Sequence, residues 1–145
     1  MFKPKESSTS WSPVAKWYGD IVGESGHYFH QHVILPGIKT FLDPKAGESV
    51  LDVGCGQGVY ARTLVHSVNY TGIDASKELI TAAKSIDKNA KHSYYVADAT
   101  KGLPVPAESF DHAVCILAIQ NMKEGAEAIA NIGTTLKGGG DLVIV

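Results

Sequence analysis

Short apolar runs alternate with longer mixed segments from residue 49 to the end of the chain. The runs are apolar throughout, which is typical of parallel strands in a sheet that is covered on both faces. The mixed segments between them have the length and composition of helices. A strand–helix alternation of this kind predicts an α/β fold. The expected strands are residues 49–53, 69–74, 92–97, 110–118 and 141–145, and the expected helices are residues 59–66, 77–87 and 123–136.

Two local signals mark the ends of these helices. Ser76 stands where a helix cap is favoured, just before the second expected helix. Lys137 and the three glycines after it follow the last expected helix and are predicted to end it.

The residues before this alternation predict a tail and two helices. Residues 1–12 are polar and rich in serine, as expected for a disordered tail. Pro13 lies in the first turn of a short predicted helix over residues 13–19, where proline is favoured. Ser25 is the expected cap of a second helix, which Pro36 kinks or restarts. The expected domains are the tail at residues 1–12, a helical segment at residues 13–43 and an α/β domain at residues 44–145.

The carboxyl ends of the expected strands are predicted to meet at one edge of the sheet. Right-handed crossovers between parallel strands leave few topologies. Ligands of open α/β sheets bind beyond the carboxyl ends of the strands. We therefore expect the loops after Val53, Ile73, Ala97 and Leu117 to line one crevice.

A glycine-rich loop, DVGCGQG at residues 52–58, follows the first expected strand. Glycine at positions 54 and 56 lets the backbone turn tightly and lets a ligand approach main-chain atoms. The dinucleotide-binding fingerprint would place its third glycine one residue later, where this chain has Val59. The loop alone is therefore a weak signal for any particular ligand.

Asp52 distinguishes between two kinds of ligand at this loop. A carboxylate there would repel a pyrophosphate, because two like charges ~4 Å apart cost roughly 4 kcal/mol at an effective dielectric constant of about 20. The same carboxylate suits a ligand that carries an ammonium and a sulfonium group. A nicotinamide-dependent oxidoreductase is therefore disfavoured as a function, and it stays an alternative.

Acidic residues also follow the next two expected strands. Asp74 can accept hydrogen bonds from two ribose hydroxyls, although dinucleotide enzymes use the same device; its other interpretation is a cap on the helix after Ser76. Asp98 can accept from an exocyclic amino group of adenine while the Ala99 N–H faces the ring, or it can simply begin a surface turn. Three carboxylates at successive strand ends form a more specific pattern than any one of them.

The motifs in residues 49–145 resemble, in order, those of the class I S-adenosylmethionine-dependent methyltransferases. The closest resemblance is to the small-molecule, ubiquinone-biosynthesis-like branch with a type 11 methyltransferase domain. Residues 18–38 resemble, more loosely, the helical lid that such enzymes place over the cofactor. The segments that carry the main resemblance are LDVGCGQG, TGIDAS, VADAT, FDHAVCILAIQNM and LKGGGDLVIV.

The resemblance implies a Rossmann-like, doubly wound parallel sheet with strand order 3-2-1-4-5, and S-adenosylmethionine as cofactor with S-adenosylhomocysteine as product. It implies methionine-side contacts around the glycine loop, ribose contacts after the second strand, adenine contacts after the third and sulfonium contacts after the fourth. The implied cofactor residues are Tyr18, Asp52, Gly54, Cys55, Gly56, Asp74, Ala75, Asp98, Ala99 and Leu117.

Family members usually continue past the fifth strand with a helix and two more strands, and this sequence stops at Val145. We therefore expect a fold truncated to about five strands. The apolar edge of residues 141–145 is expected to pair with a second copy of the chain, because exposed strand edges recruit other strands. The missing segment normally shapes the acceptor pocket, so a cofactor-binding module without catalysis stays an alternative function.

Methyl transfer by in-line displacement needs little acid–base chemistry, because positioning alone can supply roughly 7–11 kcal/mol of the barrier. The sequence accordingly names no catalytic residue. A hydroxyl or carbon acceptor can need a general base, for which a lid histidine, His27 or His30, is a candidate. These two histidines could also share a helix face, but a metal site would need a third ligand there. Gln120 follows the fourth expected strand, where the acceptor should meet the methyl group. Ordinary packing is the alternative for the histidines and a helix-capping turn for Gln120, and no metal site is expected.

The amino-acid composition limits the kinds of partner and the location that are expected. The chain has 145 residues, 44% hydrophobic and 19% charged, which suits one globular domain. Its net charge of −2 opposes a nucleic-acid partner and favours a small-molecule acceptor. The apolar run at residues 113–119 is too short to span a membrane. Cys55 and Cys115 do not form a disulfide framework, which predicts a cytoplasmic location.

Overall fold

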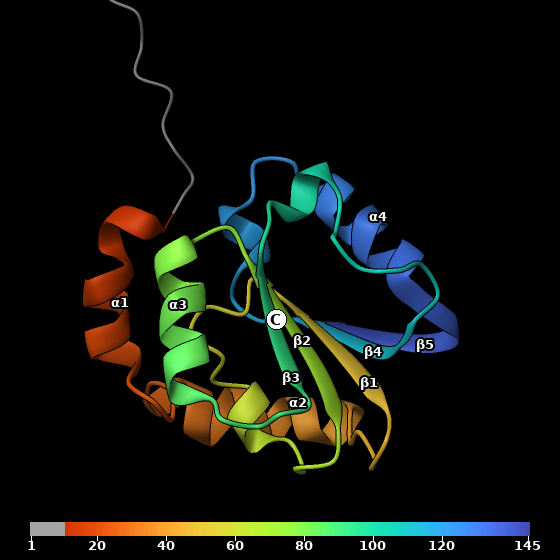
Figure 1. Cartoon of the computed structure of the whole chain (residues 1–145), viewed down its shortest axis with the longest axis horizontal. Coiled ribbons are helices and arrows are strands. Elements are labelled where there is room, and N and C mark those ends of the chain that lie inside the picture. Colours follow the sequence, from red (N-terminus) through yellow and green to blue (C-terminus); the bar gives the residue numbers. More distant parts are fainter. Residues whose placement is uncertain (1–10) are drawn as a thin grey trace, which may run out of the picture.

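The computed structural model describes residues 11–145. Its strands form one parallel sheet with the order β3-β2-β1-β4-β5 (Figure 1). This confirms the predicted α/β class and strand order, whereas the predicted tail at residues 1–12 lies almost wholly outside the described residues. The strands are β1 (Ser49–Val53), β2 (Asn69–Asp74), β3 (His92–Val96), β4 (Phe110–Cys115) and β5 (Leu136–Ile144).

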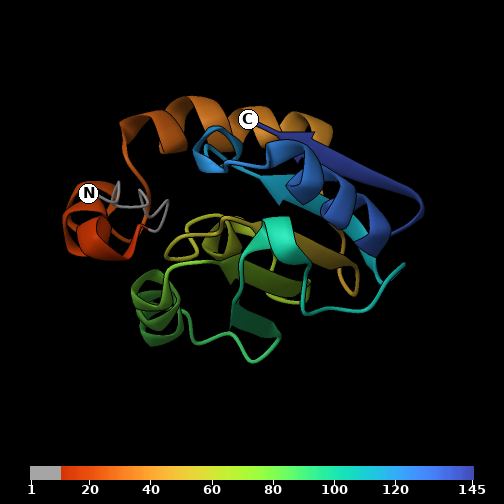
Figure 2. The ribbon, with the colours of Figure 1, turned by 90° about the horizontal axis from the view of Figure 1, so that it is seen from above.

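Helices cover both faces of the sheet. On one face, Val50 and Tyr70 join a buried apolar cluster with Ile38 and Ile80 of two covering helices. On the other face, Leu51 of β1 lies in a second cluster under another helix. Seen from above, α3 and α4 lie on opposite sides of the sheet (Figure 2). The helices are α1 (Ala15–Val22), α2 (Leu35–Phe41), α3 (Lys77–Ile86) and α4 (Gly125–Thr135).

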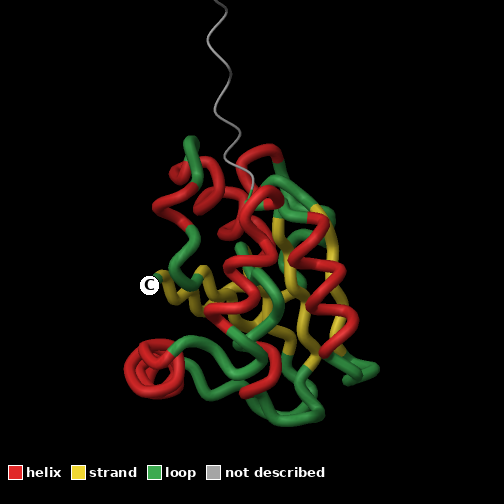
Figure 3. Tube along the Cα trace, turned by 90° about the vertical axis from the view of Figure 1, so that its left-hand side faces the viewer, coloured by secondary structure: helices red, strands yellow, loops and turns green. Residues whose placement is uncertain are grey.

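The amino-terminal helix is attached to the sheet through another helix. α1 packs beside α3 (Figure 1), and both stand in front of the strands when the molecule is viewed from that side (Figure 3). The first described turn, Ser12–Val14, is a 3₁₀ turn that leads into α1. The predicted helix at residues 13–19 is therefore present but starts and ends a little later.

The second amino-terminal helix differs from the prediction at its start. Ser25 lies in an exposed turn, and the helix begins only at Tyr28, so the predicted Ser25 cap is wrong. The residues His30–Ile34 form a wide π turn, in which the Leu35 N–H donates to the His30 carbonyl. Pro36 follows at the beginning of α2. Proline lacks an N–H and crowds the carbonyl four residues earlier, and the π turn accommodates that constraint without ending the helix.

The helix predicted at residues 59–66 is also wrong. This stretch is a turn followed by a single 3₁₀ turn at Ala61–Thr63, after which Leu64 is extended. The Tyr60 carbonyl accepts from both the N–H and the hydroxyl of Thr63. Short side chains that bond to the local backbone in this way compete with helix formation.

The last helix and strand meet earlier than predicted. α4 ends at Thr135 before the glycine run, and β5 begins directly at Leu136. The pairing with β4 shifts between Phe110↔Leu136 and His112↔Asp141, so residues 137–140 bulge out opposite one residue of β4. The glycines thus form a bulge inside the strand and do not stop the helix. β4 likewise ends at Cys115, short of the predicted residue 118.

Three further predictions concern pairing of two chains along β5, the cellular location and the membrane. β5 is an edge strand, and Ile144 is 39% exposed; pairing of two chains along it stays a prediction. Cys55 and Cys115 are buried and unpaired, and the cytoplasmic location stays a prediction. Within residues 11–145, no helix has both the length and the apolarity to cross a membrane.

The Ser76 cap gives a direct test of the fold. The Ser76 hydroxyl accepts from the Leu79 N–H at 3.2 Å, as predicted. Ser76→Ala is expected to lower the free energy of unfolding by about 1 kcal/mol, because a helix N–H loses its acceptor. Urea unfolding measures the change, and Ser85→Ala on the exposed side of the same helix is the control. Equal losses in both variants would contradict the capping role.

Candidate functional site

A hollow opens between the amino-terminal helices and the loop after β1. It has about 360 Å³ of empty space, part of it open to solvent. The hollow brings together four residues predicted to bind the cofactor and one predicted to meet the acceptor: Tyr18, Asp52, Gly54, Cys55 and His30. These residues come from α1, the glycine loop and the π turn, which are far apart along the chain.

The glycine loop folds tightly against the loop that follows β4. Gly54 has a φ of 74°, and a Cβ there would lie 2.3 Å from the Cβ of Ala118. Gly56 has a φ of 54°, and its Cβ would meet the ring of Tyr18 at 3.5 Å. Glycine is therefore required at position 54 both for the backbone angle and for space.

Asp52 is a buried carboxylate with one open acceptor. It is 2% exposed, and its Oδ2 accepts from the Tyr70 hydroxyl at 2.7 Å. Its Oδ1 is buried and has no hydrogen-bond partner. Burial raises the pKa of Asp52 to about 7, while the Tyr70 hydroxyl opposes the rise and the Asp74 charge adds to it. A buried acceptor without a donor is costly, so a cationic ligand would suit this position.

Asp74 anchors the glycine loop from the end of β2. Its Oδ2 accepts from the Gly56 N–H at 2.9 Å, and its Oδ1 accepts from the Ser76 N–H at 2.8 Å. Burial raises the pKa of Asp74, and these two backbone N–H groups oppose the rise. Each carboxylate oxygen keeps a further lone pair for a ligand. Ala75 follows and is exposed.

Tyr18 lies over the glycine loop, which makes it the part of α1 nearest to the predicted cofactor residues. Burial is the main reason that its pKa is raised, followed by the charges of Asp74 and Asp52. Trp11 packs edge-on against its ring at 5.3 Å. The hydroxyl is therefore a neutral group beside two carboxylates.

The end of β3 is only partly free for a ligand. The Asp98 Oδ1 accepts from the N–H of Thr100 at 3.0 Å and from its hydroxyl at 2.7 Å. The hydroxyl bond is the largest cause of its lowered pKa. Ala99 is buried, and its carbonyl accepts from the side chain of Asn131 at 2.8 Å. Asp98 thus begins the 3₁₀ turn Ala99–Lys101, which agrees with its interpretation as the start of a surface turn, and adenine contact stays a prediction.

Leu117, after β4, adopts a backbone angle that is rare for its type. Its φ is 51°, and its side chain is 41% exposed. Its N–H donates to the Val145 carbonyl at 2.8 Å. Strained residues of this kind cost about 1–3 kcal/mol, and the contact of Leu117 with the sulfonium end stays a prediction.

Of the three residues predicted on the acceptor side, only His30 lines the hollow, whereas His27 and Gln120 do not. His30 lines the hollow, and its buried Nδ1 has no partner. Burial, followed by the charge of His27, lowers the pKa of His30. His27 precedes the helix and is exposed, stacking on Phe29 at 6.0 Å, so the two histidines do not share a helix face. The Gln120 side chain donates to the Leu117 carbonyl at 2.9 Å.

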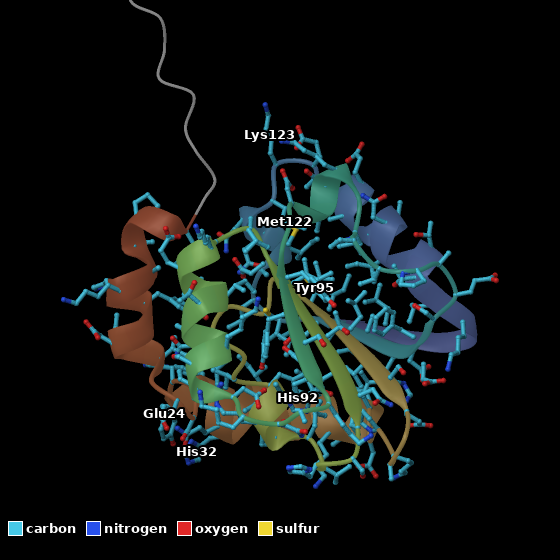
Figure 4. The ribbon with its side chains drawn as sticks, viewed as in Figure 1. Glu24, His32, His92, Tyr95, Met122 and Lys123 are labelled. Carbon is cyan, nitrogen blue, oxygen red and sulfur yellow. The ribbon has the colours of Figure 1, made fainter. Side chains whose placement is uncertain are left out.

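Sequence reasoning missed the residues that support this site. The side chain of Gln57 donates to the Gly23 carbonyl, and Arg62 Nε donates to the Glu24 carbonyl at 2.8 Å. Figure 4 labels Glu24 in the turn that follows α1. Tyr70 holds Asp52 from the neighbouring strand, and a tyrosine inside an apolar strand was a usable signal, because buried hydroxyls need partners.

Within the described residues, no group of three or more His, Cys, Asp or Glu side chains is arranged to hold a metal ion. Burial raises the pKa of the Cys55 thiol well above its ordinary value, which leaves it inert as a nucleophile. The residues around the hollow are carboxylates, glycines, a histidine and a tyrosine, and their contact with a cofactor stays a prediction.

A family described as "Methyltransferase domain" matches residues 51–144 of this chain. An O-methyltransferase of Pyrenophora dematioidea is 36% identical over 109 residues, which cover 71% of this chain and 40% of the relative. A ubiquinone biosynthesis O-methyltransferase of Photobacterium profundum is 27% identical over 144 residues, which cover 94% of this chain and 60% of the relative. The chain thus spans 40% and 60% of the lengths of these two relatives.

A solved structure shares the fold over most of the chain. Haemonchus contortus phosphoethanolamine N-methyltransferase 2, in complex with phosphomonomethylethanolamine and S-adenosylhomocysteine, has a TM-score of 0.75 at 26% identity. The match covers 92% of this chain and 32% of that one. With the matched family, it confirms the predicted resemblance: this chain belongs to the class I S-adenosylmethionine-dependent methyltransferases.

Two glycines with similar backbone angles test the packing of the loop. Gly47 has a φ of 86°, and a Cβ there meets nothing within 4 Å, unlike at Gly54. Gly47→Ala is expected to cost about 1–2 kcal/mol from backbone strain alone. Gly54→Ala is expected to cost a further 1–3 kcal/mol or so from overpacking against Ala118. Urea unfolding measures both, and similar losses would show that the β4 loop yields to the new methyl group.

The raised pKa of Asp52 makes stability depend on pH. The unfolded carboxyl loses its proton near pH 3.8 and the folded one near pH 7. Between these values the folded state binds more protons, so stability falls as pH rises. Asp52→Asn is therefore expected to stabilise the ligand-free chain at about pH 8 by roughly 2–4 kcal/mol, with little effect at about pH 4.

Chemical unfolding at the two pH values measures this difference. Asp20→Asn is the control, because that carboxylate is exposed on α1. An Asp52→Asn effect of equal size at both pH values would contradict the assignment of the titration to Asp52.

Proposed function

We propose that this chain binds S-adenosylmethionine at the carboxyl ends of β1 to β4 and forms the donor half of a methyltransferase. The observation that carries the proposal is the buried, unpartnered Oδ1 of Asp52 in a hollow beside a second carboxylate. When bound, S-adenosylmethionine supplies a methyl group on a positively charged sulfur. The residues of the chain bind it, orient it and keep water away.

Asp52 is proposed to accept from the ammonium group of the cofactor through its open oxygen. A cation there relieves both the desolvation of Asp52 and its repulsion by Asp74, the two effects that raise its pKa. Gly54, Cys55 and Gly56 would border the same part of the ligand, with main-chain atoms close to it because the glycines carry no side chain.

The remaining contacts follow the strand ends. Asp74, with Ala75, is proposed to receive the ribose hydroxyls on its free lone pairs, and Asp98 with Ala99 the adenine. Leu117 is proposed to lie at the sulfonium end. Tyr18 would cover the ligand from α1, with residues 13–43 acting as the lid.

The proposed acceptor is a hydroxyl group of a small molecule. Both curated relatives reported above are named O-methyltransferases. Oxygen acceptors need a base, and His30 lines the hollow with an imidazole whose lowered pKa keeps it neutral and able to take a proton. His27 is exposed and Gln120 turns back to the backbone, so His30 is the candidate that the geometry favours.

Isothermal calorimetry on this chain tests the cofactor. S-adenosylmethionine and S-adenosylhomocysteine are expected to bind, and NADH is not. Asp52→Asn is expected to weaken S-adenosylhomocysteine binding by about 10–100-fold, since a bond to a charged group is lost. Asp141→Asn, an exposed carboxylate on β5, is the control and should bind normally.

Binding of NADH in competition with S-adenosylhomocysteine would instead support the nicotinamide alternative. Binding without methyl transfer to phenolic acceptors, in this chain and in a longer chain alike, would support the module without catalysis. Unchanged affinity in Asp52→Asn would overturn the role given to that carboxylate.

A further inference from the structure

Tyr70 lies on β2, next to the strand that carries Asp52. Tyr70 is 1% exposed, and its hydroxyl donates to the Asp52 Oδ2 at 2.7 Å. The two residues stand on neighbouring strands, where Tyr70 pairs with Val50 and Asp52 pairs with Gly72. The tyrosine therefore reaches along the sheet face to the residue two positions further on.

Gly72 makes this reach possible. A Cβ at position 72 would lie 2.8 Å from the Tyr94 Cδ1, 2.9 Å from the Cys55 Sγ and 3.0 Å from the Tyr70 hydroxyl oxygen. The missing side chain is therefore the space through which the hydroxyl reaches Asp52. A glycine inside a buried strand weakens it, and here it leaves room for the side chains of Tyr94 and Cys55 as well as for the Tyr70 hydroxyl that bonds to Asp52.

The ring of Tyr70 is held from the other side by a buried polar cluster. It packs on His92 at 5.1 Å and on Tyr94 at 5.5 Å between ring centroids. The Asp87 Oδ2 lies 2.6 Å from the His92 Nδ1 and accepts from the Tyr94 hydroxyl at 2.5 Å. Figure 4 places His92 at the far end of the sheet from Met122, which belongs to the loop after β4. The Tyr70 ring therefore packs against two aromatic rings whose polar atoms bond to Asp87, a different carboxylate from the one that its own hydroxyl contacts.

We propose that Tyr70 is a positioning residue, whose hydroxyl occupies Oδ2 of Asp52 so that Oδ1 alone faces the cationic amino group of the cofactor. This rests on the proposed function, because it concerns the same ligand. Tyr70 itself does not touch the ligand. It acts by fixing the orientation and the charge of the carboxylate that does.

The charge of Asp52 then depends on the Tyr70 bond. A hydrogen bond to the ionised form favours that form, and here it opposes the burial that raises the pKa of Asp52 to about 7. Binding of a cation strengthens as Asp52 loses its proton, so affinity rises with pH through this value. It falls again at the alkaline end, where the amino group of the cofactor loses its own proton. Other groups that face Asp52 or line the same hollow are Asp74 after β2, Cys55 in the loop, Tyr18 on α1, Tyr60 after the loop, Cys115 on β4 and His30 in the π turn.

The test compares Tyr70→Phe with Tyr94→Phe. Each variant loses one buried hydroxyl that bonds to a carboxylate, Asp52 in the first and Asp87 in the second. The dissociation constant for S-adenosylhomocysteine is measured by calorimetry from about pH 5.5 to about pH 9. Tyr70→Phe is expected to move the midpoint of the rising part of the curve up by about one pH unit, which weakens binding about fivefold at pH 7 and up to about tenfold at lower pH. Tyr94→Phe is expected to keep the wild-type midpoint.

A second measurement does not depend on any ligand. The ¹³C chemical shift of the Asp52 carboxyl carbon, assigned with Asp52→Asn, follows its titration in the ligand-free chain. The midpoint is expected to rise in Tyr70→Phe and to stay unchanged in Tyr94→Phe.

The outcomes separate the two proposals. A wild-type chain that binds no S-adenosylhomocysteine at any pH overturns the proposed function. If the wild type binds, then a Tyr70→Phe curve that keeps its midpoint, or that weakens by the same factor at every pH, overturns the positioning role. An equal midpoint shift in Tyr94→Phe also overturns it, because the effect would then belong to the core as a whole.

Discussion

A charged group buried at the end of a central strand is the constraint around which this molecule is arranged. Asp52 lies on β1, the central strand of the sheet, and is buried. Placing a carboxylate there costs free energy unless donors or cations compensate for the lost water. The chain supplies one donor, Tyr70, and leaves the second oxygen without one. Such incomplete compensation destabilises the folded chain alone and is relieved by a positively charged ligand.

The local sequence was enough to predict where the strands lie and which carboxylates stand at their carboxyl ends. β1 and β2 coincide with the predicted residues because their apolar runs are bounded by turn residues on both sides. Asp52 and Asp74 were identifiable because parallel strands bring their carboxyl ends together. The positions of these residues follow from topology and need no knowledge of side-chain packing.

What the sequence did not predict depends on contacts between distant residues or on competition between similar local choices. The partner of Asp52 is 18 residues away on another strand. Residues 59–66 have a helical composition, but the hydroxyl of Thr63 takes the carbonyl that a helix would use. The glycines after Lys137 are a sound helix stop in isolation. Pairing with β4 recruits them into a strand, where Lys137 reaches the Asp111 carboxylate at 2.7 Å.

The π turn at His30–Ile34 has a consequence for how this segment tolerates change. Its five residues make a turn with one residue more than an ordinary helix would hold. Deleting any one of them would take away the extra residue that accommodates Pro36 and would turn the chain ahead of it relative to α2. Tyr18 lies upstream of this turn and His30 begins it, so both would change their position relative to the glycine loop. Natural variation here is therefore expected to exchange side chains freely while conserving the residue count.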